Sequence, residues 1–170
     1  MVTSATDGPR PVFVYGTLRP GAENWEPFLA GRAVHDEPGR LPGHVLFELE
    51  YPVVVEHTSA PAGAGEPPVV IGHSVHVAPD HHDRLLERLD WLEGHLPHDP
   101  GRSLYVRVRR DVERAGGEPV ECWVYLAGPE LQARVVGREP VPGGDWLAAR
   151  DPAWTDPDLP LVGPDPDGLR

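Results

Sequence analysis

One carboxylate and one turn in this sequence have the residue types and the spacing for chemistry. The carboxylate is Glu93, in the segment PDHHDRLLERLDWLEG at residues 79–94. The turn is VYGTLRPG at residues 14–21, where an apolar run stops at a glycine. Its two glycines suggest a phosphate-binding loop, but Ala22 and Glu23 follow where such a loop needs a lysine and a hydroxyl. The turn is therefore predicted to serve another ligand.

The segment around Glu93 predicts the one strong helix of the chain. Asp80 is expected as its N-cap and Gly94 as its C-terminal end, about three and a half turns later. At about 100° per residue the leucines form an apolar stripe, and Glu93 falls inside it. Three other carboxylates of the helix are expected to point away from the stripe: Asp83, Glu87 and Asp90.

The position of Glu93 predicts a raised pKa. The helix dipole disfavours a negative charge in the last turn, and partial burial disfavours it too. A carboxylate whose pKa is raised toward neutrality can accept a proton at neutral pH. The position alone also allows a frayed helix end, which would turn Glu93 into solvent.

Histidines invite a metal hypothesis, because six of the nine lie within 26 residues. His73 and His76 are three apart on an expected strand, so they point to opposite faces. No HExxH or CxxC pattern is present. The sequence therefore predicts no metal site. The six clustered histidines are His73, His76, His81, His82, His95 and His98.

Two residues could serve as nucleophiles by type. Ser74 lies in IGHSVHV, which lacks the Gly-x-Ser-x-Gly frame, and Cys122 precedes Trp123 on an expected strand. Cys122 is expected to be a small core residue. Neither residue is predicted to be catalytic.

The elements that must position these residues are mostly strands. The 22 prolines and 19 glycines argue against a helical bundle. About five or six strands with few helices suggest a small closed or half-closed sheet, because closure removes exposed edges. Apolar runs predict the strands at residues 11–15, 44–49, 52–57, 69–77, 104–112 and 119–126.

The composition favours one cytoplasmic domain. The net charge of −12 repels nucleic acid and anionic membrane surfaces, so neither is expected as a partner. A single cysteine allows no intramolecular disulfide, and no signal-peptide core or 18-residue apolar run occurs. Residues 1–10 are expected to be disordered and residues 151–170 to form a Pro/Asp-rich tail, which leaves one domain at 11–150.

Five blocks of the sequence follow one another in a specific order: VYGTLRPG at 14–21, PGHVLFELEYPVV at 42–54, LDWLEG at 89–94, SLYVRVRRDV at 103–112 and CWVYLAG at 122–128. Together they resemble the γ-glutamylcyclotransferase (AIG2-like) family over roughly residues 11–150. The resemblance implies an α+β fold, a small mixed β-barrel of about five to six strands with flanking helices. It also implies an enzyme that releases 5-oxoproline from a γ-glutamyl amine, amino acid or peptide without a cofactor.

The resemblance implies Glu93 as the catalytic general acid/base, because the family's catalytic glutamate also follows a Leu-Asp pair. In this reaction the α-amine of the substrate attacks its own γ-carbonyl, so a proton acceptor and donors for the oxyanion are needed. The turn at Gly16 leaves backbone N–H groups free of the ladder, and these can bind carboxylate or carbonyl oxygens.

The resemblance also implies a set of substrate-binding residues. Tyr105 and Tyr125 match aromatic positions of the family and either line the pocket or pack within the sheet. Arg19 either offsets the charge of an anionic substrate or is solvated. The implied binding residues are Tyr15, Gly16, Thr17, Leu18, Arg19, Tyr105 and Tyr125.

Other functions stay open at this point. A binding module with the same barrel would hold a γ-glutamyl or other small molecule without turning it over. An enzyme that removes a γ-glutamyl protecting group from a biosynthetic intermediate would share every catalytic residue. The Pro- and His-bearing segment at 95–103 is a candidate lid or specificity wall, and the oligomeric state is left undetermined.

Overall fold

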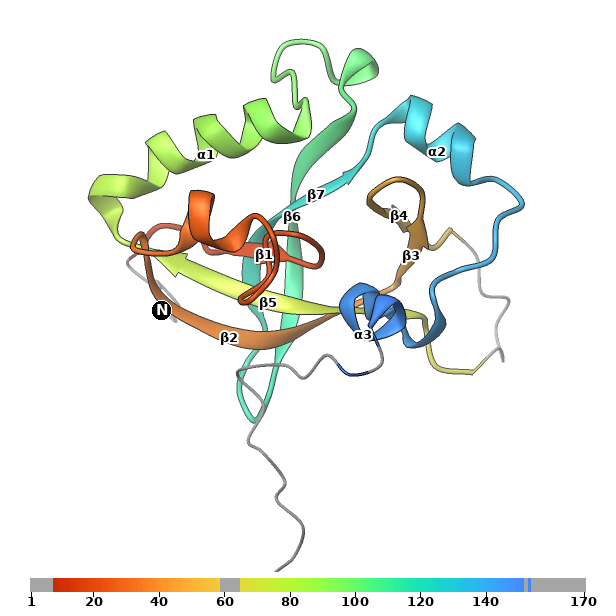
Figure 1. Ribbon diagram of the computed structural model, residues 1–170, viewed down its shortest axis with the longest axis horizontal. Helices are drawn as coiled ribbons and strands as arrows, with labels where there is room; N and C mark the ends of the chain where they lie inside the picture. Colours follow the sequence, from red (N-terminus) through yellow and green to blue (C-terminus); the bar gives the residue numbers. More distant parts are fainter. Residues whose placement is uncertain (1–7, 59–64, 152, 154–170) are drawn as a thin grey trace, which may run out of the picture.

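Five strands close into a mixed β-barrel at the centre of the chain (Figure 1). The computed structural model describes residues 8–58, 65–151 and 153. β1 closes the barrel, because it pairs antiparallel with β5 and parallel with β7. The predicted α+β barrel is therefore confirmed. Around the barrel the strands follow the order β1 (Val12–Val14), β5 (Val69–Val77), β2 (Ala33–Pro42), β6 (Tyr105–Arg114) and β7 (Val120–Ala127).

A second sheet of two antiparallel strands lies beside the barrel. It consists of β3 (His44–Glu48) and β4 (Pro52–Glu56), in a register that pairs Leu46 with Val54. β4 contacts β7 and β3 contacts β5. Both strands are predicted from the sequence, but their separation from the barrel is not.

Strand β2 carries no strand signal in the sequence, because Pro38 and Gly39 interrupt a mostly polar run. The structure pairs β2 with β5 along its whole length, while within the described residues the ladder between β2 and β6 includes only Gly39 and Arg40 of β2. A proline is tolerated where one side of the strand has no ladder. A Cβ on Gly39 would lie 2.7 Å from Val112 Cγ1, so the glycine permits close packing of β2 on β6.

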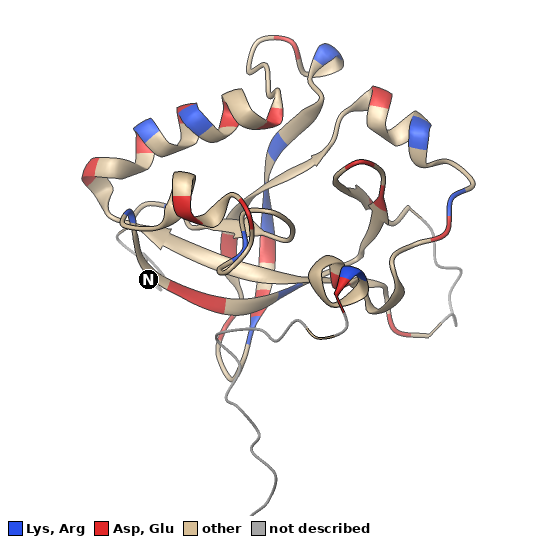
Figure 2. Cartoon of the chain, in the orientation of Figure 1, with Lys and Arg blue, Asp and Glu red and all other residues tan. Residues whose placement is uncertain are grey.

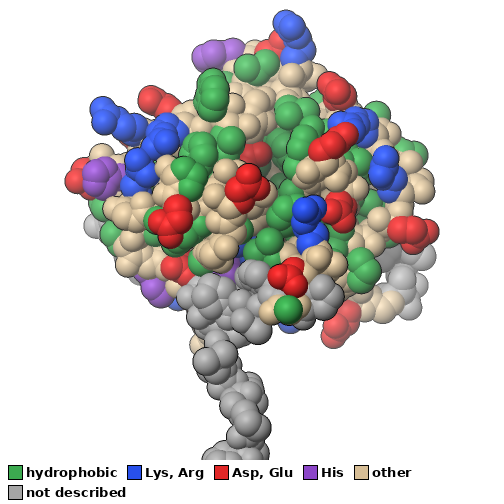
Figure 3. All heavy atoms as spheres, in the orientation of Figure 1, with side chains coloured by type: hydrophobic (Ala, Val, Ile, Leu, Met, Phe, Trp, Pro, Cys, Tyr) green, Lys and Arg blue, Asp and Glu red, His purple; other side chains and the backbone are tan. Residues whose placement is uncertain are grey.

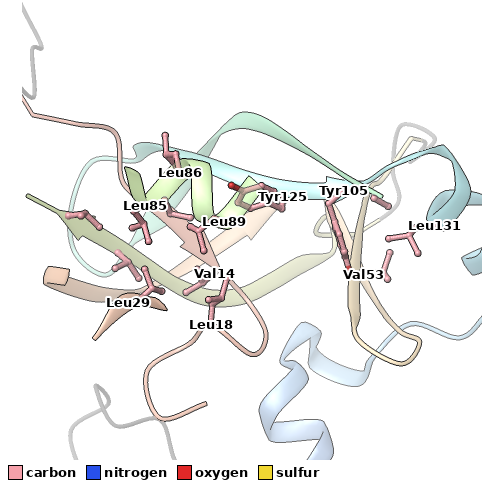
Figure 4. Close-up of a cluster of buried hydrophobic side chains, with 14 of the residues drawn as sticks. Val14, Leu18, Leu29, Val53, Leu85, Leu86, Leu89, Tyr105, Tyr125 and Leu131 are labelled. Carbon is pink, nitrogen blue, oxygen red and sulfur yellow. The ribbon is translucent and has the colours of Figure 1, made fainter. Parts of the chain in front are cut away.

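Helix α1 (Pro79–Glu93) packs its leucines onto the barrel. Leu85 and Leu89 are buried with Val14 and Leu18 in one core cluster (Figure 4). Gly94 ends the helix in a left-handed conformation, with φ of 65°. The predicted helix and its apolar stripe are therefore confirmed.

The predicted N-cap of α1 is wrong by two residues. Ala78 occupies the N-cap position without a side-chain hydrogen bond, and Pro79 follows as the first helical residue. Proline suits this position because its missing N–H would have no helical partner there. Asp80 instead lies in the first turn, where a negative charge complements the helix dipole.

The remaining helices are short and come from segments without a predicted helix. Within the part of the chain that the structure describes, no helix is long and apolar enough to cross a membrane. Both α1 and β6 carry acidic as well as basic residues in Figure 2, and both signs are interspersed with apolar side chains on the face in Figure 3. These short helices are η1 (Trp25–Leu29), η2 (Pro100–Arg102), α2 (Pro129–Val135), η3 (Pro142–Gly144) and α3 (Trp146–Arg150).

The expected terminal segments fall mostly outside the described residues. Residues 1–7 of the N-terminal segment and 154–170 of the tail belong to this undescribed part. Arg10, which the sequence places in the disordered segment, makes contacts with β7: it pairs with Glu121 and lies 4.9 Å from the ring centroid of Trp123. Arg10 therefore lies against the barrel.

Candidate active site

A cavity of about 220 Å³ lies where the end of α1 meets the turn after β1. Its walls come from that turn, from Tyr51 and Pro52 at the start of β4, and from the beginning of β6. All but one of the predicted site residues line it. These lining residues are Tyr15, Gly16, Thr17, Leu18, Glu93, Tyr105 and Tyr125.

Glu93 is the only charged side chain in the described lining of this cavity. Burial raises its pKa from the ordinary 4.5 to about 7. Within the described residues the carboxyl group has no hydrogen bond or ion pair that would hold it ionised. The shift has the predicted direction, and desolvation alone accounts for it.

The end of α1 is capped, so the frayed alternative is wrong. The N–H of Gly94 donates to the carbonyl of Trp91 at 3.4 Å, and the N–H of His95 donates to the carbonyl of Asp90 at 2.8 Å. The N–H of Leu104 donates to the carbonyl of Gly94 at 3.0 Å and ties the helix end to the approach of β6. Glu93 is therefore held at the cavity.

Three tyrosine hydroxyls around the cavity each donate to a protein oxygen. Tyr15 donates to the backbone carbonyl of Tyr125 at 2.5 Å, and Tyr105 donates to the carbonyl of Pro52 at 2.6 Å. Tyr125 donates to Oδ1 of Asp90 at 2.7 Å. Tyr105 and Tyr125 meet both expectations, because each lines the cavity and each is also buried in the core.

The same three tyrosines stay protonated at neutral pH. Burial raises the pKa of Tyr15, Tyr105 and Tyr125 well above the ordinary value of 10.0. The negative charge of Glu93 is a further cause for each. They therefore act as neutral hydrogen-bonding groups and not as bases.

The turn after β1 is fixed by its own hydrogen bonds. The N–H of Arg19 donates to the carbonyl of Gly16 at 3.1 Å, and the N–H of Asn24 donates to the carbonyl of Thr17 at 2.7 Å. The side-chain amide of Asn24 also donates to Oγ1 of Thr17 at 2.9 Å. The N–H groups of Gly16, Thr17 and Leu18 donate no backbone hydrogen bond within the described part of the chain. The turn thus offers donors along the cavity.

The structure gives a packing reason for glycine at position 16. A Cβ at Gly16 would collide with the ring of Pro52 on β4, so glycine permits this close approach of the two segments. The backbone of the turn at Gly16 therefore packs directly against Pro52 at the start of β4.

Asp90 departs from its predicted exposed position. Its side chain is only 14% exposed, and it accepts a hydrogen bond from Tyr125. The guanidinium of Arg107 on β6 holds both oxygens, with Nε 2.9 Å from Oδ1 and Nη2 3.1 Å from Oδ2. A helical wheel does not predict the burial of Asp90, because it takes no account of β6 and β7, which pass beside the last turn of the helix. The ion pair with Arg107 offsets the cost of burying the carboxylate.

Arg19 lies outside the described cavity lining, and its side chain is 0% exposed. Its Nη1 is 2.7 Å from Oδ1 of Asp145, and its Nε donates to Nδ1 of His73 at 3.3 Å. Asp145 also accepts from the N–H of Ala148 as the N-cap of α3. The expectation of a solvated Arg19 is wrong, and its position does not support substrate contact.

The other chemistry-bearing residues of the sequence lie elsewhere. Among the described residues no group of three His, Cys, Asp or Glu side chains could hold a metal ion. His73 is buried and His76 is half-buried on the other face of β5. Cys122 is a buried core residue, as predicted, 3.5 Å from the hydroxyl of Ser74, and burial raises the pKa of its thiol to about 11.

The segment at 95–103 is closed on itself. Ser103 accepts from the N–H of Leu96 at 2.8 Å and donates to the carbonyl of Asp99 at 3.2 Å. The cavity lining takes Leu92 and Leu104 from either side of this segment but no residue from within it. The candidate lid is therefore a folded loop beside the site.

The site combines a small barrel with a half-buried glutamate at the glycine turn, and comparison with known proteins identifies the family that has this fold. The family model described as "Gamma-glutamyl cyclotransferase, AIG2-like" matches residues 12–148. The chain belongs to this family. A protein of Methanocaldococcus jannaschii named "Putative gamma-glutamylcyclotransferase" is 28% identical over 115 residues, which are 68% of this chain and 82% of that protein.

Solved structures share the fold. The chain resembles YkqA from Bacillus subtilis with a TM-score of 0.54 and 21% identity, over 81% of this chain and 39% of that one. It resembles a yeast gamma-glutamyl cyclotransferase specific to glutathione with a TM-score of 0.51 and 14% identity, over 81% of this chain and 82% of that one. At these identities the likeness concerns the barrel and not the substrate.

Proposed function

We propose that this protein releases 5-oxoproline from a γ-glutamyl amine, amino acid or peptide, with Glu93 as general acid/base. The observation that carries the proposal is the carboxyl group of Glu93. It faces a cavity whose other side chains are uncharged, and its pKa is about 7. A carboxylate with that pKa is matched to proton transfer at neutral pH.

The reaction begins with a folded γ-glutamyl group in the cavity. Glu93 takes a proton from the α-ammonium, whose ordinary pKa is about 8. The freed amine then attacks the γ-carbonyl carbon, and a five-membered ring forms with a negative oxygen. The N–H groups of Gly16, Thr17 and Leu18 are the available donors for this oxygen or for the substrate carboxylate.

The second half of the reaction returns the proton. Glu93 donates it to the nitrogen of the leaving amine while the bond between that nitrogen and the former γ-carbon breaks. Glu93 then takes the proton that remains on the ring nitrogen and passes it to the released amine, so the products are 5-oxoproline and an ammonium ion, and the carboxylate is restored. The three tyrosines are buried and stay uncharged, so they take no proton from the substrate and leave Glu93 as the acceptor.

The test is an assay of the purified protein against γ-glutamyl amines, amino acids and peptides, with 5-oxoproline measured by chromatography. We expect release from at least one class, in step with the appearance of the free amine. Ligands that bind in calorimetry without any release of 5-oxoproline would overturn the enzyme proposal and favour a binding module. Release of glutamate in place of 5-oxoproline would show hydrolysis and would overturn the intramolecular attack.

A further inference from the structure

The polar groups of the cavity fall into two sets, one that can only accept a hydrogen bond from a ligand and one that can donate one. Each phenol has one proton and two lone pairs, and Tyr15, Tyr105 and Tyr125 each give that proton to a protein oxygen. Their hydroxyl oxygens can therefore only accept a further hydrogen bond. Together with the carboxylate of Glu93 they form an acceptor wall, defined by these four residues.

The turn after β1 provides hydrogen-bond donors. The N–H groups of Gly16, Thr17 and Leu18 are available donors along the cavity. The hydroxyl of Thr17 accepts from Asn24, which leaves its own proton for a ligand. A γ-glutamyl group carries an ammonium, which only donates, and a carboxylate, which only accepts. The two walls fit the two groups in one orientation.

The acceptor wall depends on one side chain that does not line the cavity. Asp90 accepts the proton of Tyr125, and Arg107 holds both oxygens of Asp90. Arg107 is itself fixed against the ring of Trp123, with its guanidinium carbon 4.6 Å from the ring centroid. This chain of contacts determines which way the hydroxyl proton of Tyr125 points.

We propose that Asp90 is a positioning residue, which keeps the hydroxyl of Tyr125 an acceptor for the α-ammonium of the substrate. The inference rests on the proposed γ-glutamyl substrate. With Asp90 replaced by asparagine, Arg107 competes for the single remaining oxygen and the amide N–H faces Tyr125. Tyr125 then turns its proton into the cavity, where it opposes the N–H groups of the ammonium.

The experiment compares two ligands that differ by one amino group. γ-Glutamylmethylamide carries the α-ammonium, and N-methylglutaramate is the same molecule without it. Binding of each is measured by calorimetry at neutral pH in the Glu93→Gln variant, which stops turnover. The readout is the preference, defined as the ratio of the two dissociation constants. A structural role for Asp90 would weaken both ligands equally and leave this ratio unchanged.

We expect Asp90→Asn in the same background to reduce the preference for the amino ligand about tenfold, the scale of one hydrogen bond to a charged group. Asp83→Asn is the matched control, because that side chain is 100% exposed on the same helix. The control should leave the preference unchanged. An unchanged preference in the folded Asp90→Asn variant would overturn the proposal.

A second variant covers the case in which Asp90→Asn does not fold. Tyr125→Phe keeps the ring and removes the hydroxyl, and it should lower the preference by a similar factor. In the Tyr125→Phe background, Asp90→Asn should change the preference little further. If the double variant lost the preference by the product of the two single losses, Asp90 would not act through Tyr125 and the proposal would be overturned. If neither ligand binds the starting variant, the γ-glutamyl substrate class is itself wrong and the inference falls with it.

Discussion

Two places in this molecule hold a partly buried glutamate, and their surroundings differ. Glu37 on β2 is 20% exposed, and Arg114 lies 2.8 Å from its carboxylate. His76 lies 3.6 Å from the same carboxylate and His35 lies 3.9 Å from it. Glu93 has uncharged neighbours in the cavity and no ion pair within the described residues. A buried carboxylate is free for proton transfer only where no cation holds it.

The same difference appears one turn apart on α1. Asp90 shares its oxygens between Arg107 and Tyr125, so each carboxylate oxygen has a partner. Glu93, three residues later, faces the cavity. His35 and His76 form a histidine face around Glu37, but the carboxylate of Glu37 is already paired with Arg114. The described lining of the cavity has one charged group, and burial raises the pKa of that group to about 7.

The largest effect is expected from Glu93→Gln. The amide keeps the size of the side chain but accepts no proton, so turnover should fall by about 10² or more while substrate still binds. Glu87→Gln, on the exposed face of the same helix, is the matched control and should change the rate little. Steady-state kinetics of both variants provide the measurement. Retention of most turnover by Glu93→Gln would remove Glu93 from the mechanism.

The second prediction concerns stability against pH. Between pH 4.5 and about 7 the folded protein keeps a proton on Glu93 that the unfolded chain has lost, so stability falls as pH rises through this window. Above pH 7 the wild type should therefore be less stable than Glu93→Gln by about 3 kcal/mol, a difference that vanishes near pH 4. Urea unfolding of both proteins at pH 5 and pH 8 measures it. Equal stabilities at pH 8 would show that Glu93 is solvated.

The contrast between the two glutamates could be predicted only in part. The helix, its leucine stripe and the inward Glu93 follow from a period of 3.6 residues, which is local information. Strand β5 follows from a strand-like apolar run, and β7 follows from the alternation of its side chains between two faces. β2 could not be predicted, because its stability comes from pairing with β5 and its own sequence is polar and broken by Pro38.

The positions of Asp90 and Arg19 needed tertiary information. A helical wheel treats the helix as having one apolar side, but β6 and β7 cover a second flank and bring Arg107 to Asp90. Arg19 lies in a turn and precedes a proline, which is typical of a solvated loop, yet its partner is the half-buried Asp145, the N-cap of α3, 126 residues later. Partners at that separation leave no periodic signal in the sequence.

The third prediction tests Glu37 as the paired member of the comparison. Glu37→Gln removes a charge that Arg114 contacts, and the pair is partly exposed, so the loss of stability should be about 1 kcal/mol. Turnover should stay unchanged, because Glu37 lies outside the described cavity lining. The two glutamate variants thus have opposite signatures in kinetics and in urea unfolding. A rate loss in Glu37→Gln without a stability loss would contradict the division.

The smallest effect is expected from chelation. Arg114 holds the carboxylate nearest to His76 and His35, and a cation at that place repels a divalent metal ion. His73 is committed to Arg19 inside the barrel. The proposed reaction uses a carboxyl group and backbone donors, so activity should survive exhaustive dialysis against EDTA. The measurement is 5-oxoproline release before and after dialysis, with and without added zinc. If dialysis abolished the activity and zinc restored it, a metal ion bound by the histidines would be needed for the reaction, and the prediction would be wrong.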